Sequence, residues 1–174
     1  MKNQYSELGV IKKINSAIVL TNTEDYAYLS SKLLKNLISK QKMAGIYVST
    51  NKDFNSILED FKKQGIDKSK VQIIATGKND AEGLTRIKSP GSLTELSILM
   101  TKNLNTGRFK FIIFDLINGT TLYNEVDTTT RFFYYLMKKS KILGIKAIAI
   151  GINDPKIEKM TPTISQLCDK VIKI

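Results

Sequence analysis

Polar and acidic residues that could contact a ligand follow three apolar runs of the sequence. Asp115 ends the run 109–115, and Asn51 stands just beyond the run 45–49. The first run, 16–21, leads into Thr21, Asn22, Thr23, Glu24 and Asp25. Because the carboxyl ends of parallel strands meet at one edge of a sheet, these residues are predicted to mark the ligand site of the fold.

The residue types that carry most enzyme chemistry are scarce. The chain has no histidine, the commonest general base and metal ligand, and its acidic residues are scattered singly. The one cysteine, Cys168, cannot form an internal disulfide and is predicted to act as a small buried apolar residue. We therefore predict that the chain is not an enzyme, and that it has no catalytic residues, no metal and no cofactor.

Apolar β-like runs alternate with helical periods along the chain, which predicts an α/β fold. Strands are expected at 16–21, 45–49, 71–75, 109–115, 145–150 and 170–174, and helices at 25–40, 53–64, from 92, at 127–141 and after 155. Residues 77–91, with three glycines and a proline, are predicted to form a long surface loop. Right-handed crossovers then give a three-layer, doubly wound, mostly parallel sheet in a single domain spanning residues 1–174.

Local signals predict where several of these helices begin and end. Asp53 is expected to cap the helix 53–64, and Gly65 to end it. Ser92 and Glu95 have the spacing of a capping box at the start of the next helix. A loop through Gly119 is expected after the strand 109–115.

Taken in order, these segments resemble the RecA-superfamily ATPases of the archaeal KaiC-like branch over almost the whole chain. GIYVS (45–49) with the helix after it is similar to the second strand and helix of that family, and SLTELS (92–97) to the helix before its Walker B strand. FIIFD (111–115) resembles Walker B itself, and CDKVI (168–172) the closing strand. The collinear set, rather than any single piece, carries the resemblance, which implies a P-loop-NTPase-type topology.

The resemblance fails at the phosphate-binding loop. Active members follow the first strand with G-x-x-x-x-G-K-[ST], whose backbone amides and lysine hold the nucleotide phosphates. Here residues 21–28 read TNTEDYAY, with no glycine and no lysine. Glu24 and Asp25 are expected at the start of the following helix, where their charges repel phosphate. The resemblance therefore implies a degenerate member that lacks the Walker A loop.

Two further positions depart from the family pattern. After the second strand, KaiC-like ATPases place an acidic residue that activates the attacking water, whereas this chain has Asn51 and Lys52. By the resemblance, Asp115 corresponds to the Walker B aspartate, but without a triphosphate a magnesium ion has little to bridge. We expect Asp115 to hydrogen-bond the empty loop position instead. ATP hydrolysis is not expected from this degenerate nucleotide site, which comprises residues 21–25, Asn51 and Asp115.

The chain is strongly basic, with 27 Lys and Arg against 16 Asp and Glu and a net charge of +11. This balance favours acidic partners: nucleic acid, an anionic membrane surface or an acidic protein. No run approaches the roughly 20 apolar residues of a membrane-spanning helix, and the polar start of the chain lacks the apolar core of a secretory signal. We expect a cytoplasmic protein without membrane insertion.

The leading hypothesis is a pseudo-ATPase that acts by protein contact, in archaeal signalling or with a catalytic RecA-like partner. Phe133 and Tyr134 belong to an aromatic cluster that surrounds most of a helix, so they either pack in the core or form a partner or self-association surface. Arg86 and Lys88 are further candidates for that surface. A nucleic-acid-binding protein is the second hypothesis. The third is a small-ligand sensor that uses Thr21, Asn22, Thr23, Ser49 and Asn51.

Overall fold

The computed structural model describes residues 9–78 and 82–174. The strands are β1 (Ser16–Thr21), β2 (Gly45–Asp53), β3 (Val71–Thr76), β4 (Leu84–Arg86), β5 (Phe111–Asp115), β6 (Lys146–Ile152) and β7 (Lys170–Lys173). The helices are α1 (Thr23–Lys35), α2 (Phe54–Gln64), α3 (Leu93–Leu104), α4 (Ile117–Thr121), α5 (Val126–Ile142) and α6 (Pro155–Ser165). A π-helical turn, η2 (Asn36–Lys40), extends α1, and a 3₁₀ turn, η3 (Lys68–Lys70), precedes β3.

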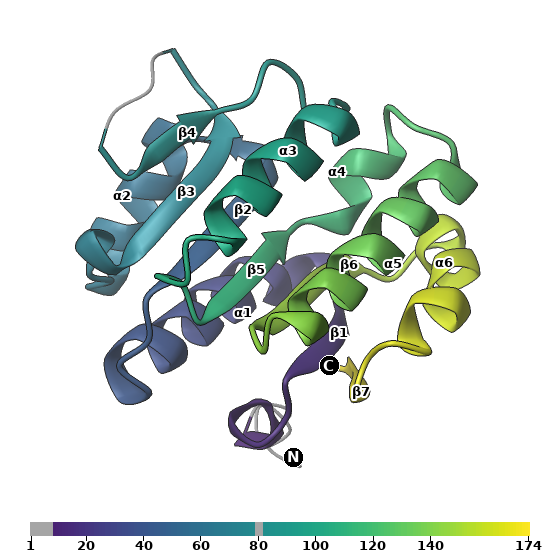
Figure 1. Ribbon diagram of the computed structural model, residues 1–174, viewed down its shortest axis with the longest axis horizontal. Helices are drawn as coiled ribbons and strands as arrows, with labels where there is room; N and C mark the ends of the chain where they lie inside the picture. The colour runs from purple at the N-terminus through teal and green to yellow at the C-terminus, as the bar shows by residue number, and fades with distance from the viewer. Residues whose placement is uncertain (1–8, 79–81) are drawn as a thin grey trace.

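One sheet runs through the molecule, with helices on both of its faces (Figure 1). It has seven strands in the order β4-β3-β2-β5-β6-β1-β7, and every neighbouring pair is parallel. Parallel strands need crossover connections because a tight hairpin cannot join them, and helices make most of these connections here. The three-layer, doubly wound α/β fold predicted from the alternating pattern is therefore confirmed.

Two apolar clusters fill the space between the sheet and its helices. Successive side chains of a strand point to opposite faces. In β5, Ile113 joins the cluster beneath α1 and α2, while its neighbour Ile112 joins the cluster beneath α3, α5 and α6. All five residues of β5 are buried, which explains why this strand reads as a continuous apolar run.

Three predicted segments differ from the structure. The helix expected at 25–40 begins at Thr23 and gives way to η2 after Lys35. The expected loop 77–91, of which residues 79–81 lie outside the described part, contains the edge strand β4, whose Leu84 is buried. The loop expected after β5 contains the short helix α4, and Ile117 of this helix is buried in the core. In the segments that contain β4 and α4, burial of an apolar side chain stabilises regular structure where the sequence predicted a loop.

The predicted helix caps were right at α2 and wrong at α3. Asp53 accepts a hydrogen bond from the Ser56 amide at 2.9 Å, and Gly65 ends α2 in the left-handed conformation with φ +64°. Ser92 makes no side-chain cap, and the Glu95 carboxylate accepts a hydrogen bond from the Lys88 amide at 3.0 Å rather than completing a capping box. Glu95 therefore ties the segment after β4 to the start of α3.

None of the helices in the described ranges combines the length and the apolar character needed to cross a membrane.

Candidate functional site

The connection between β1 and α1 consists of a single residue, Asn22. The side-chain oxygen of Asn22 accepts a hydrogen bond from the Asp25 amide at 2.8 Å, and its amide group donates to Asp25 Oδ2 at 2.8 Å. Glu24 stands in the same first turn and is exposed. The start of α1 is therefore capped by its own chain and carries two carboxylates, as the sequence predicted for this position.

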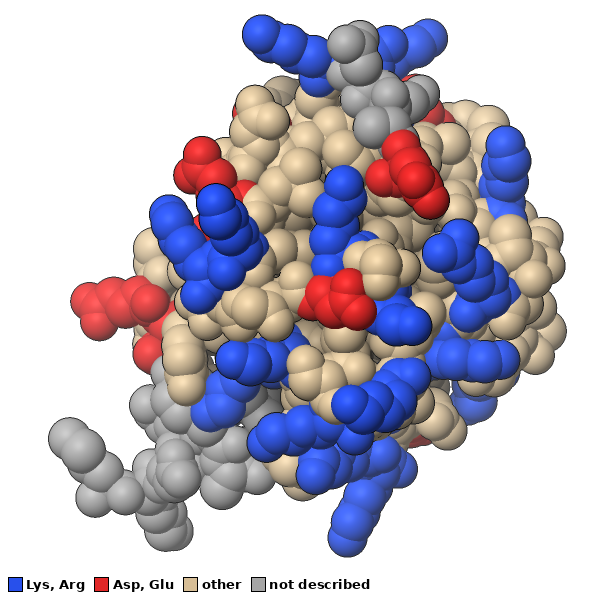
Figure 2. Space-filling view, turned by 90° about the vertical axis from the view of Figure 1, so that its left-hand side faces the viewer, with Lys and Arg blue, Asp and Glu red and all other residues tan. Residues whose placement is uncertain are grey.

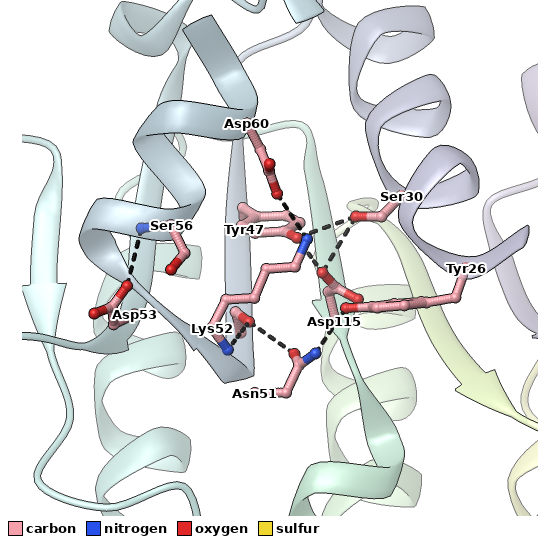
Figure 3. Close-up of polar contacts among 10 residues, drawn as sticks. Tyr26, Ser30, Tyr47, Asn51, Lys52, Asp53, Ser56, Asp60 and Asp115 are labelled. Carbon is pink, nitrogen blue, oxygen red and sulfur yellow. Dashed lines mark hydrogen bonds and ion pairs between the residues drawn. The ribbon is translucent and has the colours of Figure 1, made fainter. Parts of the chain in front are cut away.

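Asp115, at the end of β5, is fully buried with 0% exposure. The Tyr47 hydroxyl donates a hydrogen bond to Asp115 Oδ2, and the Ser30 hydroxyl donates to the same oxygen at 3.2 Å (Figure 3). The Ser30 and Tyr47 hydroxyls lie 3.0 Å apart. Asp115 thus bonds the middle of α1 and the strand β2. The expectation that it bonds the loop position at 21–25 is wrong, because α1 begins at once and its third turn reaches the strand end.

Side chains from α1, β2 and α2 surround this carboxyl group. Lys52 Nζ lies 2.8 Å from Asp60 Oδ2 and 5.6 Å from the centre of the Tyr26 ring (Figure 3). Asn51 donates a hydrogen bond to the Tyr26 hydroxyl at 2.9 Å and accepts one from Ser49 at 3.0 Å. Asn51, which the sequence placed in the degenerate site, therefore serves to hold Tyr26.

The ionisation of this cluster follows from its burial. Loss of water raises the pKa of Asp115, while the nearby Tyr26 and Tyr47 hydroxyls and the Lys52 ammonium oppose that rise. Burial and the nearby Asp115 carboxyl raise the pKa of both tyrosines. Both phenols therefore keep their protons, and Tyr47 serves as a hydrogen-bond donor to Asp115. The other carboxyl oxygen, Oδ1, is buried and makes no hydrogen bond within the described residues.

A metal ion has no evident place in this cluster. An aspartate with no exposure cannot reach a metal ion from solvent without rearrangement of the tyrosines around it. In the ranges 9–78 and 82–174, no group of three His, Cys, Asp or Glu side chains is arranged to hold a metal.

A separate open pocket of about 310 Å³ lies at the carboxyl ends of β1, β6 and β7. Thr21, Asn22 and Thr23 line it together with Asn153 and Lys173. The Thr21 hydroxyl oxygen is buried and makes no hydrogen bond to any described residue. Ser49 and Asn51 do not line this pocket. The structure thus brings together three of the five residues suggested for a small-ligand site and places the other two in the Asp115 cluster.

The candidate partner residues divide between core and surface. Phe133 is fully buried and packs edge-to-face on Phe114, with ring centroids 4.7 Å apart. Its assignment to a partner surface is therefore wrong: α5 turns Phe133 toward the sheet. Tyr134 is half-buried, whereas Arg86 and Lys88 are exposed.

Lys88 lines a groove of about 570 Å³ between the segment after β4, the start of α3 and the turn before α5. Its apolar lining includes Leu93, Ile98 and Leu99, and the Ile98 side chain is 63% exposed. Tyr123, at 61% exposure, lies against Gly91 at its border. This groove thus places one of the predicted partner residues, Lys88, beside exposed apolar side chains.

Sequence reasoning missed most of the side chains around Asp115: Tyr26, Ser30, Tyr47, Lys52 and Asp60. Two signals were available. Tyr26 and Ser30 stand four residues apart, which puts them on one face of α1, and Tyr47 is the only polar-tipped residue within the apolar half of β2. Neither signal shows which strand the helix will cover.

Comparison with solved structures identifies the architecture. The KaiC-like protein PH0186 from the hyperthermophilic archaeon Pyrococcus horikoshii superposes with a TM-score of 0.67 over 91% of this chain and 70% of that protein. The chain has the RecA/KaiC-like fold. At 11% sequence identity the likeness shows the fold alone. No protein-family model and no curated protein matches the sequence. The predicted topology is confirmed, and the loss of nucleotide binding stays a prediction.

Proposed function

We propose that this RecA/KaiC-like domain is a non-catalytic pseudo-ATPase that acts through contact with other protein surfaces. The observation that carries the proposal is the one-residue connection between β1 and α1. A phosphate-binding loop needs several residues whose amides wrap the phosphate, and a single Asn22 offers no such wrap.

Charge at the same place opposes nucleotide binding. Glu24 and Asp25 lie in the first helical turn, where a phosphate-binding helix presents its free amides and positive dipole end. Each charge-assisted hydrogen bond that is lost costs roughly 1.5–3 kcal/mol. Losing the amide cradle therefore removes several kcal/mol of binding, before repulsion by the two carboxylates is counted.

The Asp115 cluster supports the same conclusion from the other side of the site. Tyr26, Tyr47 and Ser30 occupy the surroundings of Asp115, which by the family resemblance stands at the position of the aspartate that organises magnesium. Asn51 and Lys52 stand where the family pattern has an acidic residue, and both are engaged in contacts within the cluster. The cluster thus replaces a reactive site with a structural one.

Isothermal titration calorimetry of the full chain with Mg-ATP and Mg-ADP tests the proposed loss of nucleotide binding. We expect no binding at millimolar nucleotide. Binding with a Kd below about 100 μM, a free energy of roughly −5.5 kcal/mol, contradicts the proposal. A Glu24→Gln, Asp25→Asn double variant separates charge from geometry. This variant is also expected not to bind nucleotide, because removing the two negative charges does not restore the missing backbone amides.

The groove beside α3 is the surface through which we propose that the chain contacts other proteins. Sedimentation of the full chain is expected to show self-association that Ile98→Asp abolishes. Ile142→Asp is the matched control, since Ile142 is also largely exposed, at 72% against 63% for Ile98, but lies at the opposite end of the fold. A chain that is monomeric at every concentration rules out self-association through this groove.

A further inference from the structure

Charge is unevenly distributed between the two ends of the sheet. In a parallel α/β fold the helices run back against the strands, so every crossover helix starts at the carboxyl ends of the strands and finishes at their amino ends. The first turns of α1, α3, α5 and α6 carry acidic residues, while the last turns of α1, α2, α3 and α5 carry lysines. The helix dipole favours acidic residues in the first turn and basic residues in the last turn of each helix. Because the crossover helices all run in the same direction, the lysines of their last turns gather at the same end of the sheet.

The connections that enter the strands add further positive charge. We call this surface the amino edge and define it by residues 9–15, 41–44, 65–70, 105–110 and 141–145. Its exposed basic residues are Lys12, Lys13, Lys42, Lys68, Lys70, Arg108, Lys110 and Lys141, against one exposed acidic residue, Asp67, in the same segments. Asp169, on the connection that enters β7, also lies at this edge, where it accepts hydrogen bonds from the Asn15 and Ser16 amides. Figure 2 views the side of the molecule on which part of this edge lies, and its lower half is crowded with blue side chains and has little red. Neither ion pair found within 9–78 and 82–174 involves any of these residues.

An apolar tip stands in the middle of this basic surface. Ile142 is the last residue of α5 and Leu143 begins the turn to β6, and these residues are 72% and 39% exposed. Gly144 follows them with φ +65°, which turns the chain sharply into the strand. Two adjacent aliphatic side chains at a turn make a compact projection rather than an isolated exposed residue.

Basic segments flank the tip on both sides. On one side the Lys146 amide donates a hydrogen bond to the Lys110 carbonyl at 3.0 Å, which holds the segment 105–110 beside the start of β6. On the other side the Ala147 amide donates to the Asn15 carbonyl at 2.8 Å. The buried Lys146 ammonium donates to the Ile11 carbonyl at 2.7 Å and thereby fixes the segment that carries Lys12 and Lys13.

We propose that the amino edge binds the surface of an anionic lipid bilayer, with Ile142 and Leu143 entering the headgroup region and the surrounding lysines and Arg108 contacting lipid phosphates. An apolar insertion combined with clustered basic residues is the combination that holds a protein on such a surface. The face lies opposite the nucleotide and partner surfaces discussed above, so the inference stands independently of the proposed function.

Lipid suits this surface better than nucleic acid does. Binding of single-stranded nucleic acid depends on aromatic rings on which bases stack. Within the described residues, the most exposed aromatic side chains are Tyr28, Tyr123 and Tyr135, and none of them belongs to the amino-edge segments. Aliphatic side chains at the tip gain nothing from a phosphodiester backbone, whereas they gain from contact with acyl chains.

The absence of tryptophan allows a direct test. The full chain carrying Ile142→Trp has one tryptophan, and so does the control Leu122→Trp, whose side chain is 75% exposed at the carboxyl end of the sheet. Both are mixed with phosphatidylcholine vesicles that contain about 30% phosphatidylserine, and with pure phosphatidylcholine vesicles. We expect a blue shift of the fluorescence for Ile142→Trp with the anionic vesicles only, and none for Leu122→Trp.

Vesicle co-sedimentation measures the affinity. The Ile142→Ser, Leu143→Ser variant is expected to bind at least about tenfold more weakly than the original chain, and Leu122→Ser within about twofold of it. Lys13→Gln with Lys141→Gln is expected to weaken binding about 25-fold, at roughly fivefold per charge. The matched pair Lys78→Gln with Lys173→Gln removes the same charge away from the amino edge and is expected to have a much smaller effect.

Three results would overturn the inference. The first is no sedimentation with anionic vesicles at about 0.1 M salt, where screening is moderate. The second is binding that the tip variant leaves unchanged. The third is tight, salt-sensitive binding of a single-stranded oligonucleotide by a chain that does not bind vesicles, which assigns the basic surface to nucleic acid instead.

Discussion

Removal of one hydroxyl from the Asp115 cluster tests how much the fold depends on it. Tyr47→Phe keeps the buried ring, which packs edge-to-face on Phe61 with centroids 5.7 Å apart, and deletes the donor to Asp115. Tyr47 is 2% exposed and Asp115 is 0% exposed, so water cannot replace the lost bond. A hydrogen bond contributes about 0.5–1.5 kcal/mol between neutral groups and about 1.5–3 kcal/mol to a charged one, and a buried group left unpaired costs about 1–3 kcal/mol. We therefore expect the free energy of unfolding to fall by about 2 kcal/mol.

Urea unfolding followed by circular dichroism measures this change, with the midpoint and slope fitted together. Tyr123→Phe is the control, because that hydroxyl belongs to a side chain with 61% exposure, and it should change stability by less than about 0.5 kcal/mol. A double-mutant cycle of Tyr47→Phe with Asp115→Asn should give a coupling energy of about 1–2 kcal/mol. A loss below about 0.5 kcal/mol for Tyr47→Phe, or strict additivity in the cycle, would show that the hydroxyl does not support Asp115.

Three further substitutions probe other parts of the reasoning. Because burial raises the pKa of Asp115 above its unfolded value, its stabilising contribution is complete below about pH 4 and is lost as the pH rises through the folded-state pKa. The stability of the original chain relative to Asp115→Asn should therefore decrease as the pH rises above about 4 in urea titrations, and a constant difference would contradict the raised pKa. Gly65→Ala should destabilise by about 1 kcal/mol through backbone strain alone, since its φ is +64° and its Cβ meets nothing within 4 Å; an unchanged midpoint of thermal unfolding would contradict this. Asn118→Ala should cost about 1–3 kcal/mol and speed hydrogen exchange at the Ile152 amide, which donates to Asn118 Oδ1 at 2.8 Å; unchanged exchange there would show that this bond is dispensable.

Periodicity predicted most of the fold because it records which side chains face the core. The continuous apolar run of β5 identified a central strand, and Asp53 and Gly65 marked the ends of α2. The elements that were missed, β4 and α4, are only three and five residues long. Segments of that length have no period of their own, and tertiary burial of Leu84 and Ile117 decides their structure.

Prediction of the site was less complete because its residues come from distant parts of the chain. The missing glycine and lysine after β1 are local features, and the sequence alone predicted the degenerate loop from them. The partners of Asp115 are not local: Tyr47 lies 68 positions away and Ser30 lies 85 away. No spacing rule connects residues across such intervals.

The sequence by itself determined the alternation of strands and helices, the acidic start of α1 and the net charge of +11. Only the tertiary structure decided that Phe133 faces the core, that Asp115 is enclosed by α1 and β2, and that eight exposed basic residues meet at the amino edge. The physical reason is that propensity and period act over a few neighbouring residues. Burial and electrostatic fields, in contrast, depend on which segments the parallel topology brings side by side.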